Sequence, residues 1–210
     1  MELTTTLSKS HATPREQLAQ LAQETGILRA RDLSARGIAR VYLKPLVESG
    51  LLVQLGRGLY ALADTEVSEY QTLLEAMARA PHGVIALVSA LRFHGLTTQN
   101  PWKIWMLLET GSHVPQGDYP SLTIFQAKGD SFHQGIETHT IEGKALRVTC
   151  IAKTVVDCFK YRNKIGLDVA LEALKECLTE RRATHEELRR YAKICRVERV
   201  MAPYIEAYSI

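Results

Sequence analysis

The sequence predicts an α+β protein in two parts. The first is an N-terminal module of short helices and one β-hairpin, and the second is a larger mixed α/β domain with a small sheet and C-terminal helices. Three observations predict this. Glycines separate short helical segments within residues 14–50. The hydrophobic period changes from helical to strand-like after Gly50. Strand-like segments between residues 102 and 149 precede a helical C-terminal region.

The N-terminal module begins after a polar segment. Residues 1–13 are rich in Thr and Ser, and we expect a flexible N-terminus there. Pro14 suits the first turn of a helix. The spacing of apolar residues predicts three helices, each followed by a glycine: residues 14–25, 30–36 and 38–49.

A hairpin is predicted after the third helix. Apolar residues alternate from Leu51 to Leu55, and residues 59–63 form the return strand. The turn between them is Gly56-Arg57-Gly58. Three helices followed by a hairpin within about fifty residues is the order of a winged helix-turn-helix. We therefore expect a DNA-binding domain over residues 14–64 and a second domain over residues 65–210.

The elements of the second domain follow from the same patterns. A helix is predicted over residues 66–80, and another over residues 85–94. The inward side chains of the first are Leu73, Leu74 and Met77. Strands are predicted over residues 102–109, 122–126, 136–141 and 146–149, with a tight turn at Glu142-Gly143. Helices are then predicted over residues 151–162, 168–181, 185–195 and 197–207.

Charge and composition restrict the class of protein. The formal net charge is only +3, but residues 29–60 carry six basic and two acidic residues, so the excess gathers in the N-terminal module. No apolar run approaches the roughly 18 residues of a membrane span. The N-terminus lacks the apolar region of a signal peptide, and the four cysteines form no Cys-x-x-Cys pair. We expect a cytoplasmic protein without disulfides and without contact to a membrane.

The third helix is the predicted recognition helix. Its buried stripe is predicted to comprise Ala39, Leu43, Leu46 and Val47. On the other side, Arg40 and Lys44 are one helical turn apart and suit contacts to phosphate or guanine, while Tyr42 can donate to a phosphate. Arg36 is a further predicted DNA contact. The same charges would also occur on a helical surface that is only solvent-exposed. The order of three helices followed by a hairpin favours DNA binding over that alternative.

Two residues affect how this module meets DNA. Arg57 lies between two glycines, so the hairpin tip is narrow and its arginine can enter a minor groove or contact a phosphate. Pro45 falls inside the predicted recognition helix, where a proline costs about 3 kcal/mol. The helix is therefore either kinked at Pro45 or begins later than its apolar pattern indicates.

The sequence resembles a known family over much of its length. The residues that carry the resemblance are Ala30–Ile38, Leu43, Leu46, Gly50-Leu51-Leu52, Gly56–Tyr60, Ser89-Ala90-Leu91, His94-Gly95-Leu96 and Lys153–Asp157. On these segments the chain is similar to the AbiEi-type antitoxin family, whose members are transcriptional regulators of type IV toxin–antitoxin operons. Pro45 departs from what this resemblance implies for the recognition helix, which affects the predicted readout of the operator.

The resemblance implies a function. It implies that a winged helix binds inverted repeats in double-stranded operator DNA upstream of the protein's own operon, and that the protein represses that operon. It also implies that the C-terminal domain counteracts a nucleotidyltransferase-like toxin without a stable complex. Symmetric operators favour two copies on DNA, and no heptad pattern specifies a free dimer, so we expect a monomer or a DNA-dependent dimer.

Two groups of residues in the second domain are candidate sites. Thr154 and Asp157 belong to the antitoxin-domain motif. They are expected near a helix start, where hydroxyl and carboxylate groups stabilise the helix, or alternatively Asp157 orients a surface that faces a partner or DNA. Arg189 and Lys193 belong to a basic stripe with Arg182 and Arg196, and we hypothesise that this stripe contacts DNA.

Enzymatic chemistry is not expected. Gly111-Ser112 precedes Asp118 as in a nucleotidyltransferase site, but Pro120 occupies the position of the second acidic residue that a metal ion requires. The seven histidines lack zinc-site spacing, and we expect no metal and no cofactor. His94 is expected to cap a helix C-terminus as a partly charged imidazole.

Two alternative functions stay open. The first is a one-component regulator that senses a small ligand through the C-terminal domain, where aromatic side chains line a pocket or, alternatively, form a core. These side chains are Trp102, Trp105, Phe125 and Phe132. The second is a degenerate nucleotidyltransferase-like enzyme with a DNA-targeting module.

Overall fold

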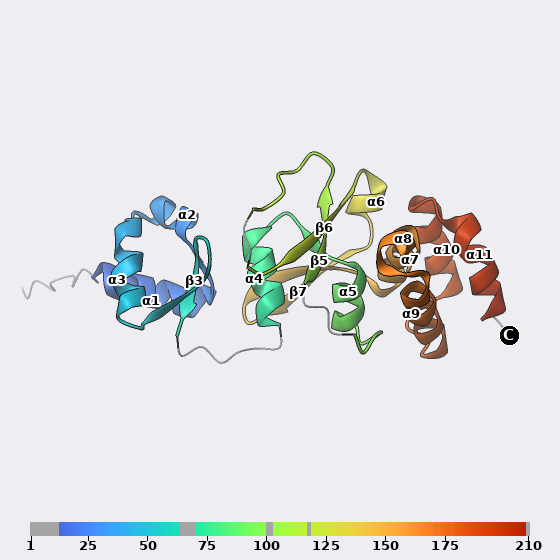
Figure 1. The fold of residues 1–210 in the computed structure, drawn as a ribbon, viewed down its shortest axis with the longest axis horizontal. Helices are drawn as coiled ribbons and strands as arrows, with labels where there is room; N and C mark the ends of the chain where they lie inside the picture. The colour runs from blue at the N-terminus through green and yellow to red at the C-terminus, as the bar shows by residue number, and fades with distance from the viewer. Residues whose placement is uncertain (1–12, 64–69, 100–102, 117–118, 209–210) are drawn as a thin grey trace, which may run out of the picture. The chain divides into compact units, whose positions relative to one another are not determined.

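The computed structural model describes residues 13–63, 70–99, 103–116 and 119–208. The chain forms two compact units, residues 1–67 and 68–210 (Figure 1). The first unit contains a three-stranded sheet and the second a five-stranded sheet, and both contain helices, so the α+β class predicted from the sequence is confirmed. None of the described helices is long and apolar enough to cross a lipid bilayer.

Helix α1, Pro14–Thr25, opens the first unit and is fixed by its N-terminal cap. The side chain of Thr13 accepts a hydrogen bond from the backbone N–H of Glu16 at 3.3 Å. The Glu16 carboxylate in turn accepts one from the backbone N–H of Thr13 at 2.7 Å, which completes a capping box. The helix buries Leu18 and Ala22 against the core of the unit.

The second and third helices are shorter than the apolar pattern predicts. Helix α2, Ala30–Leu33, continues into a 3₁₀ turn, η1, at Ser34–Arg36. Gly37 follows in the left-handed conformation, with φ of +69°. The third element begins as a 3₁₀ turn, η2, Arg40–Tyr42, and becomes the α-helix α3 only at Leu43–Glu48.

This late start of α3 corrects one prediction and resolves another. Ala39 is extended and exposed, and Ile38 is buried instead, because both residues precede the helix and do not follow its period. Leu43 and Leu46 are buried as predicted. Pro45 is the third residue of α3, where backbone N–H groups have no partner within the helix, so the proline removes no helical hydrogen bond.

The hairpin forms between β2, Leu52–Gly56, and β3, Leu59–Leu62. A short strand β1, Leu28–Arg29, which the sequence did not predict, pairs with β3 and gives the antiparallel order β1-β3-β2. Two residues are too few to display a strand period, so only the pairing with β3 reveals β1. The core of the unit comprises Leu18, Ala22, Leu28, Leu33, Ile38, Leu43, Leu46 and Leu52.

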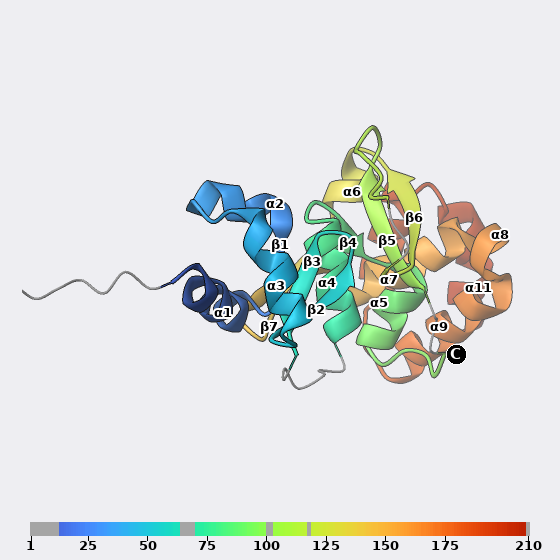
Figure 2. The same ribbon diagram turned by 60° about the vertical axis from the view of Figure 1, so that its left-hand side comes forward.

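The second unit is built on a sheet of order β6-β5-β4-β8-β7 (Figure 2). Strands β5 and β6 are parallel, as are β4 and β8, and the other pairs are antiparallel. The strands are β4 (Val84–Ile85), β5 (Ile104–Glu109), β6 (Leu122–Ala127), β7 (Ile136–Ile141) and β8 (Lys144–Thr149). The turn between β7 and β8 has positive φ at Glu142 and Gly143, as its sequence predicted.

Helix α7, Ile151–Lys160, is central to the second unit and buries eight consecutive residues from Ala152 to Phe159. Helices α5, α9, α10 and α11 pack against it. The helices are α4 (Gln71–Arg79), α5 (Leu87–Phe93), α6 (Asp130–His133), α8 (Arg162–Ile165), α9 (Leu167–Thr179), α10 (His185–Ile194) and α11 (Glu198–Ala207). The sequence predicted neither α6 nor α8, and the predicted start of α4 at residue 66 lies outside the described residues.

Candidate nucleic-acid interface

The segment formed by η2 and α3 has one face in the core and one in solvent. Leu43 and Leu46 are 3% and 4% exposed and hold the segment against the unit. On the outer side, Val41 is 71% exposed and Tyr42 is 42% exposed. Lys44 is also exposed. The segment thus presents aromatic, aliphatic and basic groups together, as a surface that contacts nucleic acid requires.

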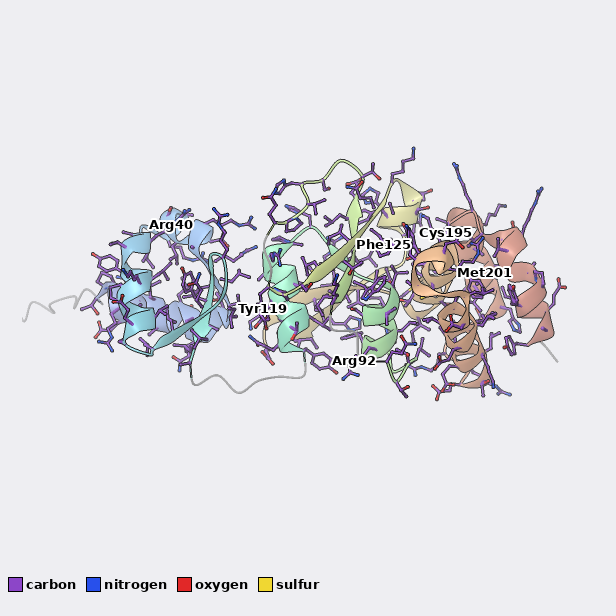
Figure 3. All side chains as sticks on the ribbon, in the orientation of Figure 1. Arg40, Arg92, Tyr119, Phe125, Cys195 and Met201 are labelled. Carbon is purple, nitrogen blue, oxygen red and sulfur yellow. The ribbon has the colours of Figure 1, made fainter. Side chains whose placement is uncertain are left out.

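Three arginines of the first unit have free charges. Arg36 ends η1, Arg40 begins η2, and Arg57 is the hairpin tip, and all three are exposed. Figure 3 shows Arg40 at the surface of its unit. Within the described part of the chain, none of the three forms an ion pair. Their guanidinium groups therefore remain available to phosphate.

Arg15 of α1 is a further exposed arginine, whereas the cations at α2 and α3 are partly neutralised. The Asp32 carboxylate lies 2.6 Å from Nε of Arg29 and 3.6 Å from Nε of Arg31. Nζ of Lys44 lies 3.8 Å from the carboxylate of Glu48, but both side chains are largely exposed, so this pair contributes little and breaks easily. Around η2 and the hairpin, the arginines without a carboxylate partner are therefore Arg36, Arg40 and Arg57.

The hairpin tip is anchored at its base. The backbone N–H of Ala30 donates to the carbonyl of Gly58 at 2.9 Å, and β1 pairs with β3 directly beside it. Gly58 has φ of +75°, a conformation that other residues rarely adopt. The tip that carries Arg57 is therefore a fixed part of the first unit, held next to the start of α2.

Thr154 and Asp157 lie in the core; Thr154 is near the start of α7 and bonds to backbone as predicted, whereas the prediction for Asp157 needs correction. Thr154 is fully buried and Asp157 is 1% exposed, in the second half of α7. Asp157 is therefore neither near a helix start nor on a surface that faces a partner. The Thr154 hydroxyl is 2.7 Å from the Thr149 hydroxyl and 2.9 Å from the Cys150 carbonyl, so it joins the end of β8 to α7.

The carboxylate of Asp157 is held by a buried lysine that the sequence did not single out. Nζ of Lys153 donates to Oδ2 of Asp157 at 2.5 Å, and Lys153 is 0% exposed. The Sγ–H group of Cys195 donates to Oδ1 at 3.6 Å. Burial and the nearby Asp157 charge raise the pKa of the Cys195 thiol to about 11, so the thiol stays protonated and unreactive. This network joins α7 to the end of α10.

The basic residues of α10 only partly form the predicted stripe. Arg189 and Lys193 are exposed, one turn apart, and lie opposite the buried side chains of Leu188 and Ala192. Arg182 instead donates to the carbonyl of His94 at 2.9 Å. It is also paired with Glu180 at 3.2 Å and therefore serves the packing of the second unit.

His94 follows α5 as predicted, but its charge differs from the prediction. Its Nε2 lies 2.7 Å from the Thr149 carbonyl, which requires the proton on Nε2. Burial lowers the pKa of His94 below its ordinary value, so the ring is neutral at pH 7. His94 is the C-cap residue of α5 as predicted, and only its expected partial charge is wrong, because the ring is largely buried and bonds to β8.

The residues that could take part in catalysis, metal binding or ligand binding are dispersed in the described part of the chain. Among the described residues no group of three His, Cys, Asp or Glu side chains could hold a metal ion, and all four cysteines are free. Asp118 and Trp102 lie outside the described residues. Trp105 stacks on Phe125 with ring centroids 5.5 Å apart, and Phe132 is 5% exposed within the core.

The two units together define a class of protein: a helix-turn-helix module with a basic outer face, joined to a mixed α/β domain. Residues 16–63 match the family described as "Transcriptional regulator, AbiEi antitoxin". This match confirms the predicted resemblance over these residues of the first unit and supports a role as a DNA-binding regulator.

Structural comparison extends the likeness to the second unit. The crystal structure of the Rv2827c protein from Mycobacterium tuberculosis superimposes with a TM-score of 0.61 and 16% sequence identity. The match covers 87% of this chain and 72% of the other. At this identity the likeness shows a shared fold. Comparison with curated protein sequences gave no match.

Proposed function

We propose that this protein is a transcriptional autorepressor and the antitoxin of a type IV toxin–antitoxin system, with no catalytic activity of its own. It binds inverted repeats upstream of its own operon through an N-terminal winged helix. Its functional partner is a nucleotidyltransferase-like toxin, which it counteracts without a stable complex. The observation that carries the DNA-binding part is the set of three exposed, unpaired arginines on the unit that matches the regulator family.

In this proposal η2 and α3 enter the major groove. Arg40 and Lys44 contact phosphates or guanine, and the Tyr42 hydroxyl donates to a phosphate. Val41, with 71% of its surface exposed, suits contact with a thymine methyl group. The hairpin is the wing, and Arg57 enters the adjacent minor groove or holds a phosphate. Two copies bind the two halves of an inverted repeat, as monomers that pair on DNA.

The cations set the expected salt dependence. If Arg36, Arg40, Lys44 and Arg57 each neutralise one phosphate, the log–log slope of affinity against salt is about −3.6 for each bound copy. A fourfold rise in salt then weakens binding about 150-fold. Without one contact the slope is about −2.7, and the same rise weakens binding about 40-fold.

The test is binding of the full-length protein to one half-site from the DNA upstream of its gene, measured by fluorescence anisotropy at two salt concentrations. Arg57→Ala should weaken binding and lower the slope by about 0.9. The matched control is Arg92→Ala, which removes an exposed arginine of α5 (Figure 3) and should leave the slope unchanged. Equal affinity for scrambled DNA, or an Arg57→Ala slope equal to that of the parent, would contradict the proposal.

A second DNA contact is proposed for α10. Arg189 and Lys193 share one exposed face of this helix, and neither forms an ion pair among the described residues. The double charge reversal Arg189→Glu/Lys193→Glu should reduce operator affinity and the salt slope on a full inverted repeat. Unchanged affinity and slope would remove α10 from the interface and leave the winged helix as the DNA contact.

The antitoxin part needs its own experiment. The toxin gene adjacent to this gene is expressed from a separate promoter, with and without the present chain, and growth is followed. Restored growth by a variant that no longer binds DNA, such as Arg40→Ala/Arg57→Ala, would separate antitoxin action from repression. Persistent toxicity with the parent chain would leave a DNA-binding regulator without antitoxin function. Metal-dependent turnover of nucleotides by the purified parent chain would contradict its proposed lack of catalysis.

A further inference from the structure

A cavity of about 760 Å³ lies in the second unit, away from the winged helix. Its walls come from the residues that follow β5 and β6, from the end of α7, and from the connection between α10 and α11. The polar and charged side chains of its lining include Thr110, Lys128, Asp130, Ser131, Lys160 and Arg196. The volume is in the range of small-molecule sites, which is about 300–1,000 Å³.

The position of the cavity is one where α/β sheets bind ligands. Strands β5 and β6 are parallel and in register, with Glu109 opposite Ala127 at their carboxyl ends. Thr110 and Lys128, the next residues along each strand, therefore emerge side by side at one sheet edge. Crevices outside the carboxyl ends of parallel strands are the usual ligand sites of open α/β sheets.

Three cations surround the cavity without a carboxylate partner among the described residues, and Nζ of Lys160 lies 5.5 Å from the centroid of the Tyr161 ring. Lys128 and Arg196 are exposed, Lys160 is half-buried, and none of them forms an ion pair within the described part of the chain. Asp130 is the acidic residue of the lining, so the lining carries a net positive charge. Like charges that converge on one concave surface repel one another unless an anion lies between them.

The walls of the cavity are held in place before any ligand binds. The Ser131 hydroxyl donates to the Ile194 carbonyl at 3.0 Å and joins α6 to the end of α10. The Tyr161 hydroxyl donates to the Gln126 carbonyl at 3.0 Å and joins α7 to β6. Cys195, which Figure 3 labels, lines the cavity and hydrogen-bonds to Asp157 beneath it. Such fixed walls reduce the entropy cost of binding.

We infer that this cavity binds a small molecule that carries a phosphate group, of the size of a nucleotide. Lys128, Lys160 and Arg196 hold the phosphate, since an arginine fork and lysine ammonium groups are the side chains that proteins use for phosphate oxygens. The hydroxyl of Thr110 faces the same space and suits a sugar or phosphate oxygen. Ala127, Ile194 and Cys195 give the organic part of the ligand an apolar wall. This inference does not depend on the proposed DNA-binding function.

The test is isothermal titration of the full-length protein without DNA, at physiological salt, with ATP, inorganic phosphate and adenosine as separate probes. ATP should bind, and adenosine, which lacks phosphate, should bind at least tenfold more weakly. Comparable affinity for inorganic phosphate would assign recognition to the phosphate alone, and tighter ATP binding would show that the rest of the cavity contributes. Both results support the inference, whereas equal binding of adenosine and ATP would overturn it.

Variants locate the binding. Lys128→Gln/Lys160→Gln should weaken ATP binding at least tenfold, with the urea midpoint of tryptophan fluorescence as the check that the unit is folded. The matched control Lys164→Gln removes an exposed lysine of α8, outside the cavity lining, and should leave ATP affinity unchanged. No ATP binding at millimolar concentration, or equal loss in both variants, would overturn the inference. So would a double variant that keeps the parent's ATP affinity but loses operator binding, because the cavity cations would then belong to the DNA interface.

Discussion

The buried pair of Lys153 and Asp157 offers the sharpest test of how the second unit is stabilised. Lys153→Met keeps the length of the side chain and removes its charge. The Asp157 carboxylate, 1% exposed, is then left in the core with the Cys195 thiol as its remaining side-chain partner. Removal of one partner from a buried ion pair costs about 3–5 kcal/mol. With a urea m-value of about 2 kcal/mol/M, the midpoint should fall by about 1.5–2.5 M.

The assay is urea unfolding followed by tryptophan fluorescence. The two tryptophans of the chain, Trp102 and Trp105, both belong to residues 68–210, so the signal reports the second unit alone. The control is Lys175→Met, which makes the same replacement at an exposed position of α9 and should change the free energy of unfolding by less than about 0.5 kcal/mol.

A double variant separates the charge effect from loss of packing. Lys153→Met/Asp157→Leu replaces the ion pair by apolar side chains and removes the stranded charge. It should therefore be more stable than Lys153→Met alone, since well-packed apolar residues often replace a buried pair without loss. A loss below about 1 kcal/mol in Lys153→Met would refute the reasoning. A double variant less stable than the single variant would refute it as well.

Three further predictions concern single positions. The folded-state pKa of His94 is lowered, so its stabilising effect is complete above the unfolded pKa of 6.5 and is lost as pH falls through the lowered value. Urea midpoints should therefore fall with pH below 6.5 in the parent and fall less in His94→Gln. Pro45→Ala should change the thermal stability of the first unit little by circular dichroism, whereas a stabilisation of about 3 kcal/mol would place the proline in a helix interior. Gly58→Ala should destabilise the first unit by about 1–2 kcal/mol in the same measurement, because φ is +75° there, while the added Cβ only reaches ordinary contact with Cβ of Ala30 at 3.8 Å. An unchanged melting temperature would contradict that account of the hairpin.

Periodicity predicted the larger elements because each of them buries a regular stripe. Strand β7 has the predicted bounds, and α10 differs from its prediction by one residue. The short elements β1, β4, α6 and α8 escaped prediction, since two to four residues do not complete a period, and Ile85 belongs to β4 and not to the predicted helix 85–94. They form where the rest of the fold supplies a partner, as β3 does for β1.

The candidate site was predictable only where local sequence determines it. The exposed Arg57 is consistent with its two flanking glycines, which permit the tight turn of the hairpin. The extended conformation of Ala39 could not be predicted from the sequence, because the helical pattern of apolar residues continues across the segment that connects η1 to η2. The cavity could not be predicted at all. Its cations come from three segments distant in the sequence, and their convergence depends on tertiary structure.

The role of each cation in this protein depends on its burial and its partners. The formal net charge of +3 does not reveal that role. Lys153 is buried and paired, so its charge contributes to the fold. Arg29 is paired with Asp32 at the surface, where its electrostatic contribution is small and partly neutralised. Arg36 and Arg57 are exposed and unpaired, so binding to phosphate would displace no internal carboxylate. A phosphate contact at such a position releases the counterions of that phosphate. The number of phosphate contacts is therefore measured by the dependence of affinity on salt, and not by the total charge of the protein.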